Sequence, residues 1–477
     1  MITLSADQVL SQSDAGLFTE LVNVWNARRP SNQLRSVYYD GEAALQDFGI
    51  SLPPQMRNIS AALGWVGKGV RAVTSRSKFE GVVSADGSDD PFELEQVLAE
   101  NSFRVEYPQA KVSSATHGCA FIAVSMDAGR PLMHLVSAES GAALWDPRRR
   151  ALRAFLEVVD VDTTNRPTLM VLYTPEKAVT IEARNSRVRV VAVVRNPLGM
   201  VTVFPLPYNP ELRRPLGHSR ITRSAMYYSD AALRTIVRAE VSAEFYSAPE
   251  YWLFGADVSA FQDADKWSAV MGRIKALDYQ DGDPKPELHR YSGASPQPHT
   301  DQLRMWANLF ADDQDLEVKF ADSSNPSSAD AIFAAKETLI TTTRDANEVW
   351  DSAAVRALQC AVMLRDGLTA MPDELRRLSI RSTDPAIVSP SARADAFSKL
   401  ATSIDGFGAS DVGMEFAGLS QEQIVRFKAE RERGAAGSRV QELIEVAKGL
   451  RAVNDGDSAA GGGVPAGESV VGSSGAA

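Results

Sequence analysis

Cysteine is almost absent from this sequence of 477 residues, which contains only Cys119 and Cys360. Two thiols in so long a chain exclude a disulfide framework and favour assembly in a reducing compartment such as the cytoplasm. Histidine is also scarce. His134, His218, His289 and His299 are scattered and have no metal-ligand spacing. We therefore expect neither a disulfide nor a metal site.

Long apolar runs are also missing. The most apolar stretch, Val188–Val194, contains Arg189 and is followed by Arg195. It is far shorter than the roughly 20 residues that a membrane-spanning helix needs. The first residues, MITLSADQVL, lack the basic region and the apolar stretch of a secretion signal. The sequence therefore predicts a soluble protein that has no membrane segment and is not exported.

The sequence motifs of common enzyme sites are lacking as well. The string nearest to a phosphate-binding loop, Gly64–Val70, has the wrong spacing and no hydroxyl residue after Lys68. His117 and Cys119 are two residues apart, so on a strand they could share a face as a base and a nucleophile. A buried cysteine beside a polar histidine is the favoured interpretation, because no third group is evident. We expect no catalytic residue and no cofactor.

The net charge of −11 argues against a protein that grips nucleic acid, because such proteins neutralise phosphates with Lys and Arg. A conduit past which DNA slides is still compatible with this charge. One segment, 213–238, is locally basic, with six arginines and one acid, Asp230 (6 − 1 = +5). Within it, Arg234 and Arg238 share a helix face. The favoured interpretation is a face paired with acids of a neighbouring subunit, and the alternative is contact with passing phosphates. The six arginines are Arg213, Arg214, Arg220, Arg223, Arg234 and Arg238.

The first half of the chain combines helices with a β-rich region. A first helix is predicted with Ser5 and Gln8 at capping-box spacing and with Leu17, Leu21, Val24 and Trp25 on one face. Two shorter helices are predicted near 60–73 and 91–100. From about residue 104 to 204, apolar β-branched runs separated by turn residues predict a mostly antiparallel sheet. In the run 188–194, the even-numbered residues would share one face.

The second half is predominantly helical. A long helix is predicted over 219–248, followed by a segment rich in Gly, Pro and Asp and a helix over 299–311. The clearest helix extends from a capping box at Ser327 and Asp330 to about Asp366. The β-branched residues Thr341, Thr342 and Thr343 lie in its middle and predict a kink and a hinge, since their hydroxyls can bond to the preceding turn. Two more helices are predicted over 391–403 and 420–451. The tail, 452–477, has the composition of a disordered segment.

Two blocks of this sequence resemble portal proteins of tailed bacteriophages, especially siphophages of actinobacteria. The first block is 204–257. Its family features are a Val-Pro-like strand, an Asn, a Gly-x-Ser that opens a helix, an Asp-Ala pair and an acid before Ala-Pro. They match Val203–Leu206, Asn209, Gly217–Ser219, Asp230–Ala231, and Glu244 before Ala248–Pro249. The second block comprises 295–313 and 323–339, and the early pieces 38–41 and 47–54 fit as well. The polar stretch 313–320 departs from the Gly-containing apolar loop of many relatives.

This resemblance implies an α+β portal subunit, with the following divisions in chain order. Residues 1–217 would form the N-terminal wing, 218–248 the stem helix, 249–297 the clip and 298–315 the second stem helix. Residues 316–395 would hold the tunnel loop, the kinked helix and the remaining wing, 396–451 the helical crown, and 452–477 the tail. In the family, the tunnel loop touches DNA at the narrowest part of the channel. The DNA-channel candidates here are therefore Arg234, Arg238, Asp322, Ser323, Ser324 and Asn325.

The resemblance also implies the partners. They are further copies of the chain in a dodecameric ring, the terminase large subunit, a head-tail adaptor protein, major capsid and scaffold proteins, and double-stranded DNA in the channel. The expected location is the portal vertex of the virion. Two alternatives stay open from the sequence alone. One is another capsid-associated protein, such as a scaffold or a minor head protein, and the other is an enzyme with an unrecognised site.

Overall fold

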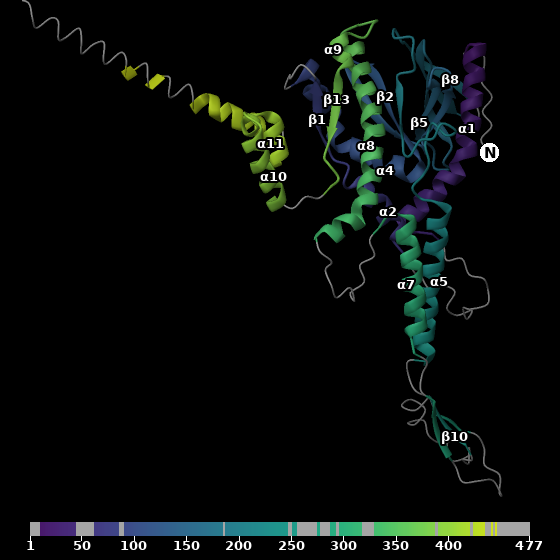
Figure 1. Ribbon diagram of the computed structural model, residues 1–477. Helices are drawn as coiled ribbons and strands as arrows, with labels where there is room; N and C mark the ends of the chain where they lie inside the picture. Colours follow the sequence, from purple (N-terminus) through teal and green to yellow (C-terminus); the bar gives the residue numbers. More distant parts are fainter. Residues whose placement is uncertain are drawn as a thin grey trace, which may run out of the picture. The chain divides into compact units, whose positions relative to one another are not determined.

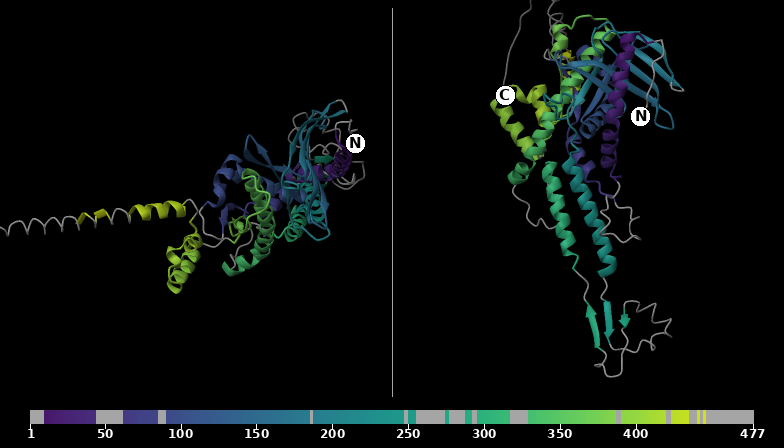
Figure 2. Two further views of the ribbon diagram at one scale, coloured as in Figure 1. Left: turned by 90° about the horizontal axis from the view of Figure 1, so that it is seen from above. Right: turned by 90° about the vertical axis from the view of Figure 1, so that its right-hand side faces the viewer.

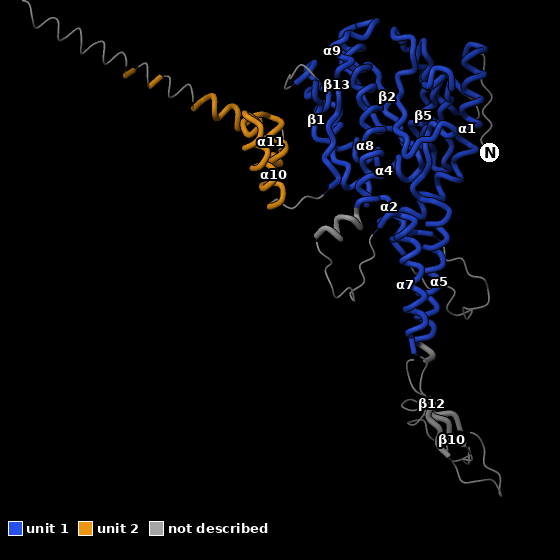
Figure 3. The backbone as a smooth tube through the Cα atoms, viewed as in Figure 1, with its two compact units in different colours: residues 1–386 blue, residues 387–477 orange. Residues whose placement is uncertain are grey.

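The computed structural model divides the chain into two compact units, Met1–Ala386 and Ile387–Ala477 (Figure 3). The predicted cap at Ser5 and Gln8 and the predicted disordered tail lie outside the described residues. Those residues are 10–43, 62–84, 90–184, 187–246, 250–254, 274–276, 287–291, 295–316, 329–386, 390–419, 423–434, 440–441 and 444–445.

The body of the first unit is built in four layers (Figure 1). Helix α1 (Gln12–Asp40) covers the outer face of a five-stranded antiparallel sheet of order β4-β5-β6-β7-β8. A three-stranded antiparallel sheet of order β3-β2-β9 packs on its inner face, and helices α4 (Phe103–His117) and α8 (Ala329–Arg365) cover the far side. The strands are β2 (Cys119–Asp127), β3 (Arg130–Ser137), β4 (Gly141–Asp146), β5 (Ala151–Val161), β6 (Pro167–Tyr173), β7 (Lys177–Arg184), β8 (Arg187–Arg195) and β9 (Val203–Pro207).

Strand β2 lies in the middle of these layers, and its sequence shows why. Successive side chains of a strand point to opposite faces. Phe121 and Ala123 enter the core between the two sheets, whereas Ala120, Ile122 and Val124 enter the core beneath α4 and α8. Both faces are therefore apolar, which fits a strand that is covered on each side.

Helix α1 confirms the predicted apolar face, and Ser11 is its N-cap. The Ser11 hydroxyl accepts a hydrogen bond from the Asp14 backbone N–H. Phe18, Leu21 and Trp25 are buried against the five-stranded sheet, and Trp25 Nε1 donates to the Glu139 carbonyl (2.7 Å). The described helix is thus fixed to the sheet by apolar packing and by a bond from one of its own core side chains.

Helix α4 corrects the prediction that the β-rich region begins near residue 104. Phe103, Tyr107 and Ala110, spaced at helical intervals, are buried in the core together with Ala115. Pro108 lies in the second turn of this helix, where it resembles a helix-breaking signal in the sequence. The tertiary packing of the aromatic face outweighs that signal.

Strand β8 corrects the predicted face of the run 188–194. Val188 pairs with Ala183 and Val190 pairs with Ile181, as strict alternation requires. Val191 then bulges out of the ladder, and Val193 instead pairs with Val179, a buried residue of the same face, which α1 covers. A single extra residue reverses the alternation that follows it. The even-numbered residues of this run therefore share one face only as far as Val190.

The other elements of the first unit flank these layers. A two-stranded sheet pairs β1 with β13, and a small sheet of order β11-β10-β12 lies in the chain between α5 and α7. The elements are α2 (Trp65–Thr74), β1 (Phe79–Ser84), η2 (Pro91–Glu93), α3 (Leu94–Glu100), α5 (Arg223–Tyr246), β10 (Glu250–Phe254), β11 (Ile274–Ala276), β12 (Glu287–Tyr291), α7 (Gln297–Asp313), α9 (Asp373–Arg376) and β13 (Leu378–Ser382).

The long helices predicted in the second half of the chain are confirmed as α5, α7 and α8. Helix α5 begins four residues after the predicted start (223 − 219 = 4), because the Thr222 hydroxyl accepts from the Ala225 N–H and ends the irregular segment before it. The second unit contains α10 (Pro390–Ser403), η4 (Phe407–Ala409) and α11 (Asp411–Ala417), and residues 423–434 are helical. Helix α11 was not predicted.

A buried charge joins α4 to α8 inside the core. The side chain of Lys111 is fully buried, and its Nζ donates to Ser77 Oγ (2.8 Å) and lies 3.7 Å from Asp351 Oδ1. Tyr107 Oη also donates to Asp351 (3.0 Å), and the Lys111 ammonium lies over the Tyr107 ring. Burial lowers the pKa of Lys111 to about 8, although the Asp351 charge opposes the shift. Burial raises the pKa of Asp351, and Lys111 opposes that shift.

Candidate functional site

Helices α5 and α7 run side by side away from the layered body (Figure 2). Their contacts have an antiparallel register. Thr222 Oγ1 donates to Asp313 Oδ2 (2.8 Å) near the body, and Thr235 contacts Gln302 further out (3.5 Å). Between these points, the ring of Trp306 lies close to the rings of Tyr227 and Tyr228. The pair is thus held by polar contacts at intervals and by aromatic contacts between them.

The guanidinium of Arg220 joins this helical pair to the body. The side chain is only 6% exposed. Its Nε donates to the Gly69 carbonyl at 2.9 Å, one Nη donates to Tyr208 Oη at 2.9 Å, and the other donates to the Gln314 carbonyl. The Asp315 carboxylate lies 3.8 Å away. One planar cation therefore connects four parts of the chain. They are the residues before α5, the residues after α7, helix α2 and the residues after β9. We call these contacts the stem junction.

The segment 217–219 positions Arg220 in the stem junction. Gly217 has φ +81°, and a Cβ there would lie 2.4 Å from the Tyr208 carbonyl oxygen and 2.5 Å from the Gly118 carbonyl oxygen. The His218 N–H donates to the Tyr208 carbonyl, and the Ser219 hydroxyl accepts from the Ile221 N–H (3.0 Å). The Gly-x-Ser pattern is thus explained by a close backbone approach and a local cap.

Gly217→Ala is expected to lower the free energy of unfolding by roughly 3 kcal/mol or more, because it combines a left-handed backbone with a severe steric overlap. Gly199→Ala is the matched control, since Gly199 has φ +64° but nothing within 4 Å of its Cβ position. The control should cost only about 1 kcal/mol. Urea unfolding followed by circular dichroism measures both. Equal losses for the two variants would contradict the close approach at Gly217.

Helix α8 reaches the stem junction through its threonine run. Thr342 Oγ1 lies 3.4 Å from Asp315 Oδ2, and Thr343 Oγ1 donates to the Leu339 carbonyl at 2.7 Å, the predicted bond to the preceding turn. Thr341 is exposed. Thr342 also lines a hollow of about 440 Å³ together with Arg220 and Asp315. The helix continues unbroken through all three threonines, and their role as a hinge stays a prediction.

The arginines of the basic segment lie in different surroundings. Arg220 is buried in the stem junction. Arg234, a predicted DNA-channel residue, is 9% exposed and lies on α5 near Asp230 and Tyr38. Burial raises the pKa of Asp230, while the Tyr38 hydrogen bond and the Arg234 charge oppose this shift. Arg238 is half-buried. Burial shows that Arg234 is directed to neighbours within its own chain, while the DNA-channel role of both residues stays a prediction.

The other predicted site residues fall into two groups. Asp322, Ser323, Ser324 and Asn325 lie outside the described residues. His117 and Cys119 do not form a nucleophile-base pair. His117 Nε2 contacts the Ser36 hydroxyl (3.0 Å), and burial raises the pKa of the Cys119 thiol well above its ordinary value.

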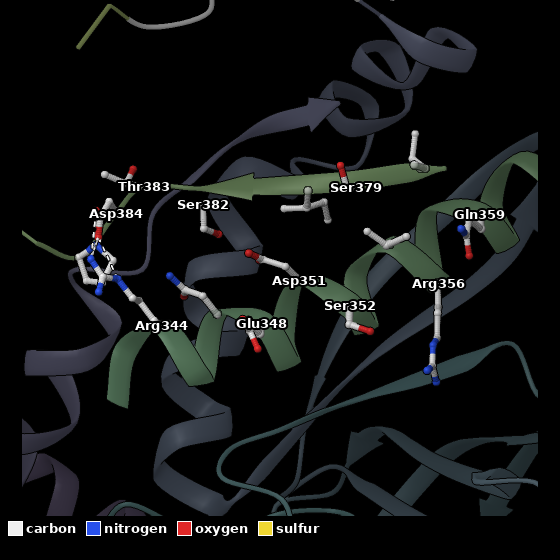
Figure 4. A pocket seen from close by; sticks show the side chains of 15 residues that line it. Arg344, Glu348, Asp351, Ser352, Arg356, Gln359, Ser379, Ser382, Thr383 and Asp384 are labelled. Atoms are coloured by element: carbon white, nitrogen blue, oxygen red, sulfur yellow. Dashed lines mark hydrogen bonds and ion pairs between the residues drawn. The ribbon is translucent and has the colours of Figure 1, made fainter. Parts of the chain in front are cut away.

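A polar groove of about 680 Å³ lies between α8 and β13 (Figure 4). Asp351 from α8 and Ser382 from β13 point into it, and Arg344 forms an ion pair with Asp384 at one end (3.0 Å). The groove therefore gives water access to Asp351, while Lys111 on its far side is fully enclosed. Among the residues that the structure describes, no three His, Cys, Asp or Glu side chains are grouped to hold a metal ion. No helix in this described part is long and apolar enough to cross a membrane.

Sequence reasoning missed the importance of Arg220, Tyr208 and Gln314. Arg220 was counted among the arginines of a basic segment, because composition does not separate a buried cation from exposed ones. The usable signal was its position directly after Gly217–Ser219. A position where a close backbone approach permits only glycine lies in a densely packed region. A residue that follows it closely in the chain is well placed to be buried there.

The fold and the stem junction define a class of α+β subunit in which a helical pair is anchored to a layered body. The chain belongs to the family of phage portal proteins, since the family model described as "Phage portal protein, SPP1 Gp6-like" matches residues 19–432.

Two curated relatives and one solved structure are similar to the chain. The portal protein of Mycobacterium phage L5 is 26% identical over 379 residues, covering 76% of this chain and 77% of that protein. The portal protein of Mycobacterium phage D29 is 27% identical over 400 residues, covering 80% and 81%. The solved structure "Neck of native GTA particle computed with C12 symmetry" has a TM-score of 0.41 and 11% identity, over 81% of this chain and 98% of that one.

Proposed function

We propose that copies of this chain close into a dodecameric ring at one vertex of a phage capsid, and that DNA enters and leaves through its central channel. Family membership supports the portal role. The chain would be a structural protein that docks partners and catalyses no reaction of its own. Its partners would be the terminase large subunit during packaging, a head-tail adaptor afterwards, and the capsid and scaffold proteins around it.

The observation that carries the ring is the exposed surface of the helical pair. Tyr227 on α5 and Met305 and Leu309 on α7 are exposed in the single chain. Two helices alone bury too little apolar surface to be stable as a pair, since most helical stability comes from tertiary packing. A neighbouring copy that covers these side chains would supply the missing packing. A head-to-tail interface of this kind closes into a ring or grows as a filament.

The purified protein is expected to have a mass many times 51.6 kDa, because each copy offers a surface that another copy covers. Light scattering at micromolar concentration measures the mass, and negative-stain microscopy shows whether the particle is a ring with a channel. A stable monomer, or a particle without a channel, would overturn the proposed function.

We also propose the division of labour along the chain that the family resemblance implies. Helices α5 and α7 would form the stem, and the segment between them the clip. Residues 1–217 and part of 316–395 would form the wing, and residues 396–451 the helical crown. Asp322–Asn325 would be the channel loop, supported by α8 with Thr341–Thr343 as its hinge. Arg238 would be the better placed of the two arginines for a phosphate contact, because Arg234 is buried.

A further inference from the structure

Strand β8 presents an open, apolar edge. It is the last strand of the five-stranded sheet and is hydrogen-bonded only to β7 among the described strands. At the bulge and beyond it, its side chains are exposed, with Val191, Val193 and Val194 at 53 to 58%. Unpaired strand edges with exposed apolar residues are templates for pairing with another chain, and proteins usually cover or interrupt them.

The free edge of the three-stranded sheet β3-β2-β9 differs from that of β8, because a side chain caps it. Strand β3 also has one free side, but the Asn101 side chain lies along it. Asn101 Oδ1 accepts from the Met133 N–H at 2.7 Å, and its Nδ2 donates to the Pro131 carbonyl at 3.0 Å. An amide side chain thus takes the place of a neighbouring strand there. In the described part of the chain, no such side-chain bond closes the backbone of β8 beyond the bulge.

A hollow of about 770 Å³ lies beyond the Asn101 cap and is lined by α4, β3 and the last residues of α1. We call it the α4–β3 hollow. Val105, Val112 and Leu135 line it, and Val105 is 64% exposed. Its acidic lining residues are Asp40 and Glu106, and no Lys or Arg lines it. The hollow therefore combines apolar side chains with a polar lining that carries two carboxylates and no Lys or Arg.

The charges of β8 are opposite to those of Asp40 and Glu106. Its sequence, RVRVVAVVR, contains three arginines and no acid. Arg195 is exposed beside Val194, and Arg189 shares the Glu182 carboxylate with Arg184. The strand thus combines apolar side chains with a positive charge, and the hollow combines apolar side chains with two carboxylates.

We propose that the β8 edge of one copy docks in the α4–β3 hollow of the next copy. This inference rests on the proposed ring. The two surfaces are different patches of one chain, so their contact is head-to-tail, as a closed ring requires. Opposite charges fix which patch meets which, and they disfavour the contact of β8 with a second β8.

Cysteine cross-linking tests this contact. Cys119 and Cys360 are both buried, so introduced thiols are the ones that react. Copies with Val193→Cys and copies with Val105→Cys are mixed, assembled, and treated with a short bismaleimide. We expect a covalent dimer from the mixture and none from either variant alone. Val159→Cys replaces Val193→Cys in the control, because Val159 is similarly exposed (50% against 58%) but lies on β5.

The outcomes separate this inference from the proposed function. Rings without the dimer from the mixture would overturn the docking of β8 and leave the portal role intact. A dimer from Val193→Cys alone would overturn it in favour of a two-fold contact between β8 strands. Absence of rings in the unmodified protein would overturn the proposed function itself. Val193→Asp should reduce ring formation at least tenfold more than Val159→Asp, with the fold of each checked by circular dichroism.

Discussion

Arg220→Met is expected to lower the free energy of unfolding by roughly 3–5 kcal/mol, the cost of removing one member of a buried charged network. The substitution leaves the Gly69 and Gln314 carbonyls and the Tyr208 hydroxyl, which belong to buried residues, without their donor. Each unsatisfied polar group costs about 1–3 kcal/mol. The stem junction should therefore open before the rest of the body does.

Arg223→Met is the matched control, because Arg223 is exposed three residues further along the same segment. It should change the stability by about 0.5 kcal/mol or less. Urea unfolding gives the free energies, and hydrogen exchange at the start of α5 and the end of α7 shows where protection is lost. A loss of protection in the five-stranded sheet alone would contradict the role of Arg220 at the stem junction.

Asp351→Asn is expected to cost roughly 3–5 kcal/mol at pH 7, because it leaves the Lys111 ammonium buried without its anion. The Asn side chain keeps an acceptor for the Tyr107 hydroxyl, so the variant isolates the charge. The double variant Lys111→Met with Asp351→Asn should recover most of this loss, since replacing both members of a buried ion pair is often close to neutral. Losses that simply add would contradict the pairing.

The same variant should show a distinct pH dependence. The pKa of Lys111 in the folded protein is about 8, below its ordinary value of 10.5. Between these values the unfolded chain binds more protons than the folded one, so stability rises with pH. Without Asp351 the folded pKa falls further, and the rise begins at a lower pH. The deficit of Asp351→Asn relative to the wild type should therefore shrink between pH 7 and 9.5, as measured by urea unfolding.

The long elements of this fold could be predicted from the sequence, because their signals are local. Helix α8 follows from its helical composition and from Gly367, which has φ +65° just after the helix ends. The strands from β5 to β8 follow from β-branched runs between turns. Helix α4 could not be predicted in this way, because its aromatic face is stabilised by distant residues and Pro108 gives a misleading local signal.

The stem junction was only partly predictable, for a related reason. The Gly217–Ser219 pattern marked the place, but nothing local indicates that Arg220 reaches Gly69, 151 residues earlier. The bulge at Val191 could not be predicted from the local sequence either. A bulge depends on how β7 pairs with β8, and a run of valines is compatible with either register.

The distance along the chain between Lys111 and its partners has a consequence for synthesis. Tyr107 is separated from Asp351 by 244 residues. At about 5–20 residues per second, roughly 12 to 49 s pass before the ribosome reaches Asp351. The core beneath α4 also takes Trp350 and Leu358 from the same helix. The core face of α4 therefore lacks these partners until most of the chain has been synthesised.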